Sequence, residues 1–249
     1  MTTFYWRTRT QSRTGLPTSS QSTALPWGTD ITDFGVPTPT NATYKLGNLS
    51  TGIGNGDLGS TALPSAAQTA RQSGLMGIFA SWPLAAQTVS AQTWTMFVGN
   101  SSGNNRANPY VAASFYIWRS GAVASYIYDS AAELGSEWTT TTSVESFTAS
   151  LGSFTLQAND ILVLEIWVTA AQDKSNSYTN EVLWDGFDDT STGNSNSWPA
   201  SYISVPQTLE FESQVNGHLG DLKINAMYVG DNKVLKGALG SFGIYDTRT

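Results

Sequence analysis

The sequence predicts an all-β protein with the architecture of a sandwich, and three observations lead to that prediction. Charged residues make up only 12% of the 249 residues, whereas Phe, Trp and Tyr together make up another 12%. The chain is also rich in Ser and Thr, as expected when the outward positions of strands are solvated by hydroxyl groups. Apolar residues alternate with period two, and no window of about eleven residues keeps the apolar spacing of an amphipathic helix.

The first half of the chain contains strand-like segments that are aromatic or that alternate between apolar and polar residues. A tight hairpin is expected at Ser120-Gly121, where the chain turns between two such segments. Pro83 ends one of the others or marks an edge strand. The segments are Phe4–Arg9, Gly74–Trp82, Gln92–Gly99, Tyr110–Arg119 and Ala122–Tyr128.

The second half repeats the pattern, with a turn expected at Ala158-Asn159-Asp160. Ile161–Thr169 is almost entirely apolar, which is typical of a central strand buried on both faces. The expected strands are Val144–Leu151, Ser153–Leu156, Ile161–Thr169, Tyr178–Trp184, Tyr202–Val205 and Leu209–Phe211. About nine or ten strands at this spacing fit a sandwich or barrel.

Two segments differ from this core. Residues 11–72 are rich in Thr, Ser, Pro, Gly and Asn, and a structureless loop of that length is unusual in a compact domain. They are expected to form an excursion with short strands of its own, or an arm that lies on a neighbouring subunit. Residues 213–249 contain two similar short units, which predict a β-ribbon too small to be stable alone. The predicted organisation is a sandwich over 1–212 and a docking ribbon over 213–249.

Short aromatic and apolar motifs recur along residues 4–212: Phe4-Tyr5-Trp6-Arg7, Ala80-Ser81-Trp82-Pro83-Leu84, Thr93-Trp94-Thr95, Tyr116-Ile117-Trp118-Arg119, Ile127-Tyr128-Asp129, Asp160-Ile161-Leu162-Val163-Leu164-Glu165-Ile166-Trp167 and Leu209-Glu210-Phe211. The series resembles the jelly-roll domain of minor tail, baseplate and head-decoration proteins of tailed bacteriophages. The motif Ala226-Met227-Tyr228-Val229-Gly230-Asp231-Asn232-Lys233-Val234 is similar to a ribbon repeat at the C-termini of phage tail and fibre proteins.

This resemblance implies a non-enzymatic virion structural protein, made in the host cytoplasm without a signal peptide and assembled on the particle surface. A minor tail or baseplate component is the leading expectation, and a head decoration or cement protein is the alternative. Expected partners are copies of the chain itself, as a trimer or ring, and other virion proteins. A formal net charge of −7 makes nucleic acid a poor partner. No membrane span is expected.

Composition also limits the chemistry. The chain has no cysteine, which excludes thiolate metal sites, disulfides and a Cys–His nucleophile. Its single histidine, His218, lies in a Gly-flanked linker, and no Gly-x-Ser-x-Gly elbow occurs. We therefore expect no enzyme activity and no cofactor.

Carboxylates are the remaining candidates for chemistry. A glycosidase would need Glu165 beside a second carboxylate, and no spacing places it near the acidic loop that follows Trp184. The alternative is that Glu165 points outward or pairs with an arginine such as Arg119. The acidic loop offers oxygen ligands for calcium but lacks the EF-hand order. Its weak calcium candidates are Asp185, Asp188 and Asp189.

Carbohydrate binding is the main functional alternative, because exposed aromatic rings can stack on sugars. Such a site would make the protein an adhesin module for a host-surface glycan. The alternative is that most of the nine tryptophans form the core and intersubunit contacts. The candidates near loops are Trp138, Trp198, Tyr110 and Tyr178.

Docking is expected at the C-terminal ribbon. Its lysines, Lys223, Lys233 and Lys236, are either solvated or paired with an acidic patch on a neighbouring subunit. The expected assembly residues are Tyr228, Val229, Lys233, Val234, Leu239 and Ile244.

Overall fold

The computed structural model describes these parts of the chain: residues 1–8, 15–22, 45–50, 59–62, 72–102, 109–129, 137–138, 140, 143–170, 180–184, 201–212, 214–216, 226–229, 232–234, 238–239 and 242–243. They contain strands and no helix, so the all-β prediction is confirmed over this part of the chain. No helix there is long and apolar enough to cross a membrane.

The strands up to residue 205 build the body. They are β1 (Thr2–Thr8), β2 (Lys45–Ser50), β3 (Gly59–Ala62), β4 (Gln72–Ser81), β5 (Gln87–Val89), β6 (Gln92–Ser102), β7 (Pro109–Arg119), β8 (Ala122–Asp129), β9 (Ser143–Leu151), β10 (Phe154–Leu156), β11 (Ile161–Ala170), β12 (Asn180–Trp184) and β13 (Tyr202–Val205). The short strands that follow are β14 (Gln214–Asn216), β15 (Ala226–Val229), β16 (Asn232–Val234), β17 (Ala238–Leu239) and β18 (Phe242–Gly243).

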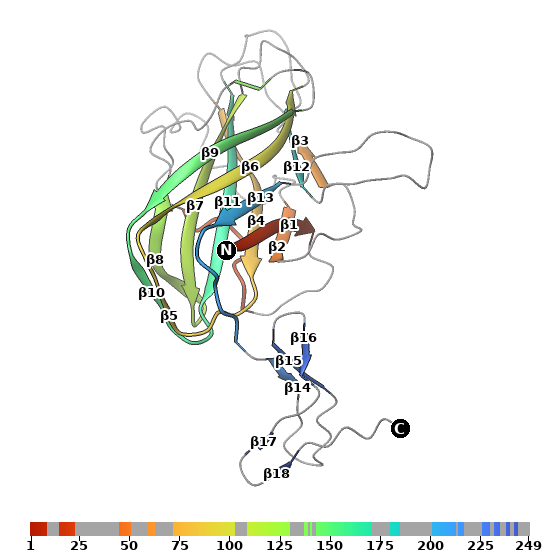
Figure 1. Cartoon of the computed structure of the whole chain (residues 1–249). Helices are drawn as coiled ribbons and strands as arrows, with labels where there is room; N and C mark the ends of the chain where they lie inside the picture. The colour runs from red at the N-terminus through yellow and green to blue at the C-terminus, as the bar shows by residue number, and fades with distance from the viewer. Residues whose placement is uncertain are drawn as a thin grey trace.

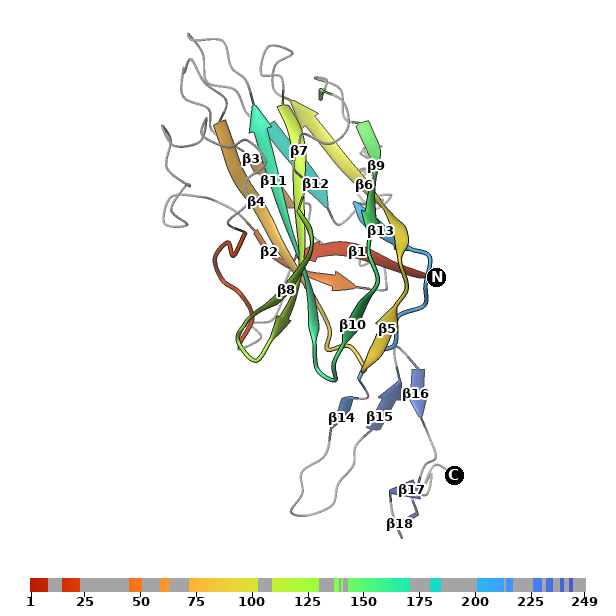
Figure 2. The same ribbon diagram turned by 90° about the vertical axis from the view of Figure 1, so that its left-hand side faces the viewer.

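Eleven strands form one hydrogen-bonded sheet in the order β3-β12-β6-β13-β1-β2-β4-β11-β7-β8, with β9 also paired to β6. All of its pairings are antiparallel except that of β2 with β4. The sheet curls on itself, so that β6 and β9 lie opposite β7 and β11 (Figures 1 and 2). This curl encloses an interior face and leaves an exterior one.

The interior face carries the main core, because alternate residues of every long strand point inward. On β7, for example, Phe115 and Ile117 face the interior, while Tyr116 and Trp118 face the exterior. The largest interior side chains with under 2% exposure are Trp6, Trp94, Trp138, Phe4, Phe79, Phe115, Leu49, Met76 and Leu84.

A second apolar cluster lies on the exterior face of β4, β11 and β7. This explains why β11 is apolar at nearly every position: it is a central strand between β4 and β7 and is covered on both faces. The members are Leu16, Leu75, Ile78, Ala80, Ala112, Tyr116, Trp118, Val163 and Trp167. Leu16 comes from outside these strands, from a segment that lies on this face.

The predicted hairpin between β7 and β8 is confirmed. Ser120 and Gly121 both have positive φ, 51° and 83°, as a two-residue turn of the primed type requires. Asn159, in the predicted turn before β11, also has positive φ. The prediction that Leu209–Phe211 forms a strand is wrong. Only an isolated bridge from Phe211 to Leu84 occurs there.

Residues 11–72 contribute more than the predicted excursion. Strand β2 lies inside the main sheet, between β1 and β4, and β3 lies at its edge beside β12. Leu49 of β2 is fully buried in the main core. Part of this segment is therefore integral to the body.

The residues after the body form two small sheets of their own, β14-β15-β16 and β17-β18, which share no strand pairing with the main sheet. In Figure 1 they extend below the body, beyond the short pair β5–β10 at its base. The predicted ribbon strands are present in this region.

Candidate functional site

Glu165 is the most unusual polar residue of the body. It lies in the middle of β11 on the exterior face, yet it is fully buried. Its neighbours across the sheet are Ile78 of β4 and Ser114 of β7. A buried carboxylate needs several hydrogen bonds to offset the loss of water.

Both carboxylate oxygens of Glu165 are fully engaged by neutral donors. Two donors come from the sheet, and three come from residues 15–22, which we call the strap. Oε1 accepts bonds from the Tyr116 hydroxyl at 2.9 Å and the Gln21 backbone N–H at 2.7 Å. Oε2 accepts bonds from the Ser20 hydroxyl at 2.8 Å, the Trp167 indole N–H at 3.3 Å and the Ser22 backbone N–H at 3.4 Å.

The other end of the strap is held by an apolar contact. Leu16 is 8% exposed and belongs to the exterior cluster. The Trp118 indole N–H donates a bond of 2.6 Å to the Gly15 carbonyl. Between the two ends, the Tyr126 hydroxyl donates to the Gln21 carbonyl. The strap thus contacts side chains on the exterior face of β11, β7 and β8.

Asp129, at the end of β8, adjoins this site. Its Oδ1 accepts bonds from the Ser114 hydroxyl and from the Ser22 hydroxyl, the latter at 3.5 Å. Burial raises the pKa of Asp129, and these two hydrogen bonds partly oppose that shift. The strap therefore contacts both carboxylates through Ser22.

The phenols beside Glu165 remain protonated. Burial, and then the charge of Glu165 and its hydrogen bond, raise the pKa of Tyr116 far above its ordinary value. The pKa of Tyr126 is also raised, first by burial and then by the charges of Glu165 and Asp129. These hydroxyls act as donors that hold the carboxylate and the strap in place.

This arrangement suits a structural clasp. Each oxygen of Glu165 already accepts two or three bonds, so a substrate would have to displace the strap to reach it. Glu165 points to the exterior face, as one alternative expected, but the strap covers it and it is fully buried. The suggestion that it pairs with Arg119 is wrong. Arg119 instead pairs with Asp160 at the base of the body, with an Nε–Oδ1 distance of 2.7 Å.

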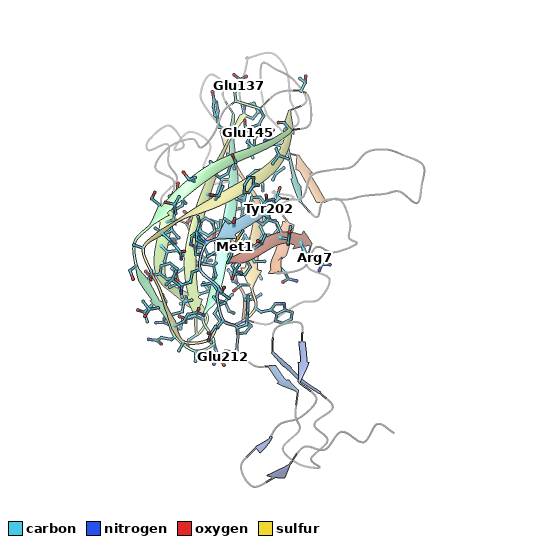
Figure 3. The ribbon with its side chains drawn as sticks, viewed as in Figure 1. Met1, Arg7, Glu137, Glu145, Tyr202 and Glu212 are labelled. Carbon is cyan, nitrogen blue, oxygen red and sulfur yellow. The ribbon has the colours of Figure 1, made fainter. Side chains whose placement is uncertain are left out.

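An aromatic row lies on the opposite exterior face of the body, across β1, β13 and β6. The rings of Phe97 and Tyr202 stack with centroids 4.4 Å apart, and Tyr5 lies 5.6 Å from Tyr202. All three rings are half-buried. Tyr202 lies near the centre of this face, with Met1 and Arg7 at the two ends of β1 (Figure 3).

The predicted sugar-binding residues are not brought together in the described part of the chain. Trp138 is 1% exposed and packs in the main core, so the expectation that its ring is accessible is wrong. Tyr110 is half-buried on β7. Trp198 and Tyr178 lie outside the described residues. Sequence reasoning missed the row formed by Tyr5, Phe97 and Tyr202, because its members come from three distant segments.

The calcium candidates Asp185, Asp188 and Asp189 also lie outside the described residues, as do His218 and Ile244. Within the ranges that are described, no three His, Cys, Asp or Glu side chains group together in a way that could hold a metal ion. Among the predicted docking residues, Tyr228 pairs with Lys233 between β15 and β16. Val229, Val234 and Leu239 also lie in ribbon strands.

The strap donors were missed by sequence reasoning, although two signals pointed toward them. Glu165 in an apolar strand indicates a buried carboxylate, and residues 19–22, Ser-Ser-Gln-Ser, are a dense run of donors. Nothing local joins these segments, which are more than 140 positions apart. No protein-family model and no curated protein matches the chain.

Proposed function

We propose that this chain is a non-enzymatic structural protein of a tailed bacteriophage particle, exposed on the particle surface as a minor tail or baseplate component. One observation supports the proposal most directly: a body with its own core is followed by short ribbons whose described strands pair with one another and not with the main sheet. Every described member of the main core lies between Phe4 and Phe211. Such an organisation suits a body that is presented by a separate docking element.

The segment that leaves the body toward the ribbons is held by backbone hydrogen bonds. A docking element that bears force needs such an attachment. The Ala85 N–H donates to the Glu210 carbonyl at 2.9 Å, and the Glu212 N–H donates to the Pro83 carbonyl at 3.0 Å. Glu212 lies at the base of the body, where the chain leaves toward β14 (Figure 3). Force applied to the ribbon would therefore reach the body through backbone hydrogen bonds.

We also assign the body to the jelly-roll class. Support comes from the curled sheet, in which strands far apart in the sequence are neighbours. Strand β1 pairs with β13, and β2 pairs with β4 in parallel. The short β5–β10 pair lies at one end of the body (Figure 1).

The first test is the presence of the protein in purified particles of the phage whose genome encodes it. Mass spectrometry should find the chain at a fixed copy number, and immunogold labelling should place it on the tail. Label on the head would favour the decoration alternative. Particles that lack the chain would overturn the whole proposal.

A second test addresses the ribbon. Tyr228 is registered with Gln214 on one side and Lys233 on the other, so Tyr228→Pro should break both pairings. We expect loss of incorporation into particles with an unchanged melting temperature of the body. Tyr228→Phe is the matched control and should incorporate normally. Normal incorporation of the proline variant would mean that the ribbon is not the anchor.

Carbohydrate binding is a second candidate, because Tyr5, Tyr202 and Phe97 place three half-buried rings on one exterior face. Thr3, Ser204 and Thr95 follow in the same register and supply hydroxyl groups. The test is a glycan array probed with the full chain and with Tyr202→Ala. Val144→Ala, at an exposed apolar position on β9, is the control. Binding that is lost only in Tyr202→Ala would support this role. Tyr110→Ala tests the position predicted from the sequence.

A further inference from the structure

We propose that the strap, residues 15–22, opens and closes as a unit of its own over the exterior face of the sheet, with Glu165 as the anchor that holds it shut. This inference concerns the body alone and does not depend on the proposed function.

The strap is separable from the sheet because it has no strand pairing with it. Gly15, Ser20, Gln21 and Ser22 form hydrogen bonds with side chains of the sheet rather than with its backbone. Segments that lack backbone ladders and deep packing are the ones that open locally before the whole molecule unfolds. Its buried residues are Leu16 and Pro17, near one end, whereas residues 19–22 at the other end are only partly buried.

Glu165 controls the closed state because three of its five donors belong to the strap. Hydrogen bonds to an ionised group are stronger than those between neutral groups. An amide at position 165 would carry no charge, and its nitrogen would face N–H and O–H groups that also donate. Glu165→Gln therefore weakens the hydrogen bonds that hold the strap on the sheet. The sequence of the strap itself stays unchanged.

Opening leaves the main core intact. The strap lies on the exterior cluster, whereas the core fills the interior of the curled sheet. On β11, Val163 belongs to the exterior cluster and Val168 belongs to the main core, and both are fully buried. Opening of the strap should expose Val163 to solvent and leave Val168 buried.

The absence of native cysteine allows a direct test by thiol labelling of the full chain. Val163→Cys reports on the exterior face, and Val168→Cys reports on the core, with the same chemical change on the same strand. Each probe is combined with Glu165→Gln. The control background is Glu210→Gln, which makes the same charge change at an exposed residue.

We expect Glu165→Gln to accelerate labelling of Val163→Cys by about tenfold or more, with little change at Val168→Cys. Glu210→Gln should change neither rate. Equal acceleration at both probes would mean that the strap opens only with the whole body, and no acceleration at Val163→Cys would mean that Glu165 is not the anchor. Either result overturns the proposal.

Leu16→Ala provides an independent route in case the Gln variant folds poorly. It truncates the apolar end of the strap and leaves the sheet unchanged. We expect the same selective acceleration at Val163→Cys. Hydrogen exchange should agree, with faster exchange of the Gln21 and Ser22 amides and unchanged exchange in β7 and β11.

Discussion

Arg119 donates two parallel hydrogen bonds to the buried carboxylate of Asp160, from Nε to Oδ1 and from Nη2 to Oδ2, each at 2.7 Å. The carboxylate also accepts the Gln157 N–H at 2.7 Å, and the Asp160 carbonyl accepts the Leu84 N–H at 2.8 Å. The hydrogen bond to Asp160 raises the pKa of Arg119. This pair joins the end of β7 to the turn before β11 at the base of the body. The C-terminal segment leaves the body close to this point.

Replacing Arg119 tests how much the bidentate hydrogen bonding to Asp160 contributes to stability. Arg119→Lys keeps the charge but cannot make two parallel bonds, so we expect a lower melting temperature than that of the native chain. Arg119→Ala should lower it further, because a fully buried carboxylate would lose its cationic partner. Thermal unfolding followed by circular dichroism measures both. A lysine variant as stable as the native chain would show that charge alone suffices.

The hydroxyl of Tyr116 is expected to stabilise the fold through Glu165. Tyr116→Phe keeps the buried ring and removes one donor at 2.9 Å from the carboxylate. We expect a loss of about 2 kcal/mol in the free energy of unfolding, measured in urea. Tyr128→Phe is the control, since the hydroxyl of Tyr128 bonds to nothing in the described ranges, and it should change the free energy little. Equal effects of the two substitutions would contradict this role of Tyr116.

Gly47 in β2 is a position where a side chain does not fit. An added Cβ would lie 2.3 Å from Cδ1 of Phe79 and 2.5 Å from the carbonyl oxygen of Arg7, and backbone atoms cannot move aside cheaply. Gly47→Ala should therefore destabilise the body by about 3 kcal/mol. Gly152→Ala meets nothing within 4 Å and should be close to neutral. Similar unfolding midpoints for both variants would contradict the close packing of β2 on β4.

Asp129 gives the fold a specific dependence on pH. Burial raises its pKa in the folded state above the ordinary value of 3.8, so the folded protein binds this proton more tightly than the unfolded chain does. Its contribution to stability is therefore greatest below pH 3.8 and is lost as the pH rises through the raised pKa. Asp129→Asn removes this loss and keeps an acceptor for Ser114.

The measurement compares urea unfolding of the native chain and Asp129→Asn at several pH values. The free energy of unfolding of the variant minus that of the native chain should increase with pH across this window. If this difference in free energy stays constant or decreases as the pH rises, the pKa of Asp129 is not raised in the folded state.

Strands with clear local patterns could be predicted from the sequence. Alternation in β7 and β8, and the Ser120-Gly121 turn between them, depend on neighbours within a few positions, so local reasoning suffices. Local patterns do not place strand β2 in the sheet, because its pairing partners β1 and β4 are distant in the sequence. Leu209–Phe211 has the composition of a strand, but its pairing is limited to a single bridge between Phe211 and Leu84.

The candidate site was likewise predictable only in its local features. That Glu165 is buried could be suspected from the apolar strand around it. Its partners could not be found, because Ser20 and Gln21 reach it across more than 140 positions. Likewise, Asp160 and Arg119 are 41 positions apart, and only the register of β7 against β11 places them together.

By itself, the sequence determined the all-β class, the central position of β11 and the absence of thiol chemistry, because composition and period-two alternation are local properties. Only the tertiary structure decided which faces are covered and which distant side chains meet. A sheet that curls on itself creates an interior and an exterior, and long-range pairing decides which residues share each face. The strap over Glu165, the pair at the base and the aromatic row around Tyr202 are all consequences of that curl.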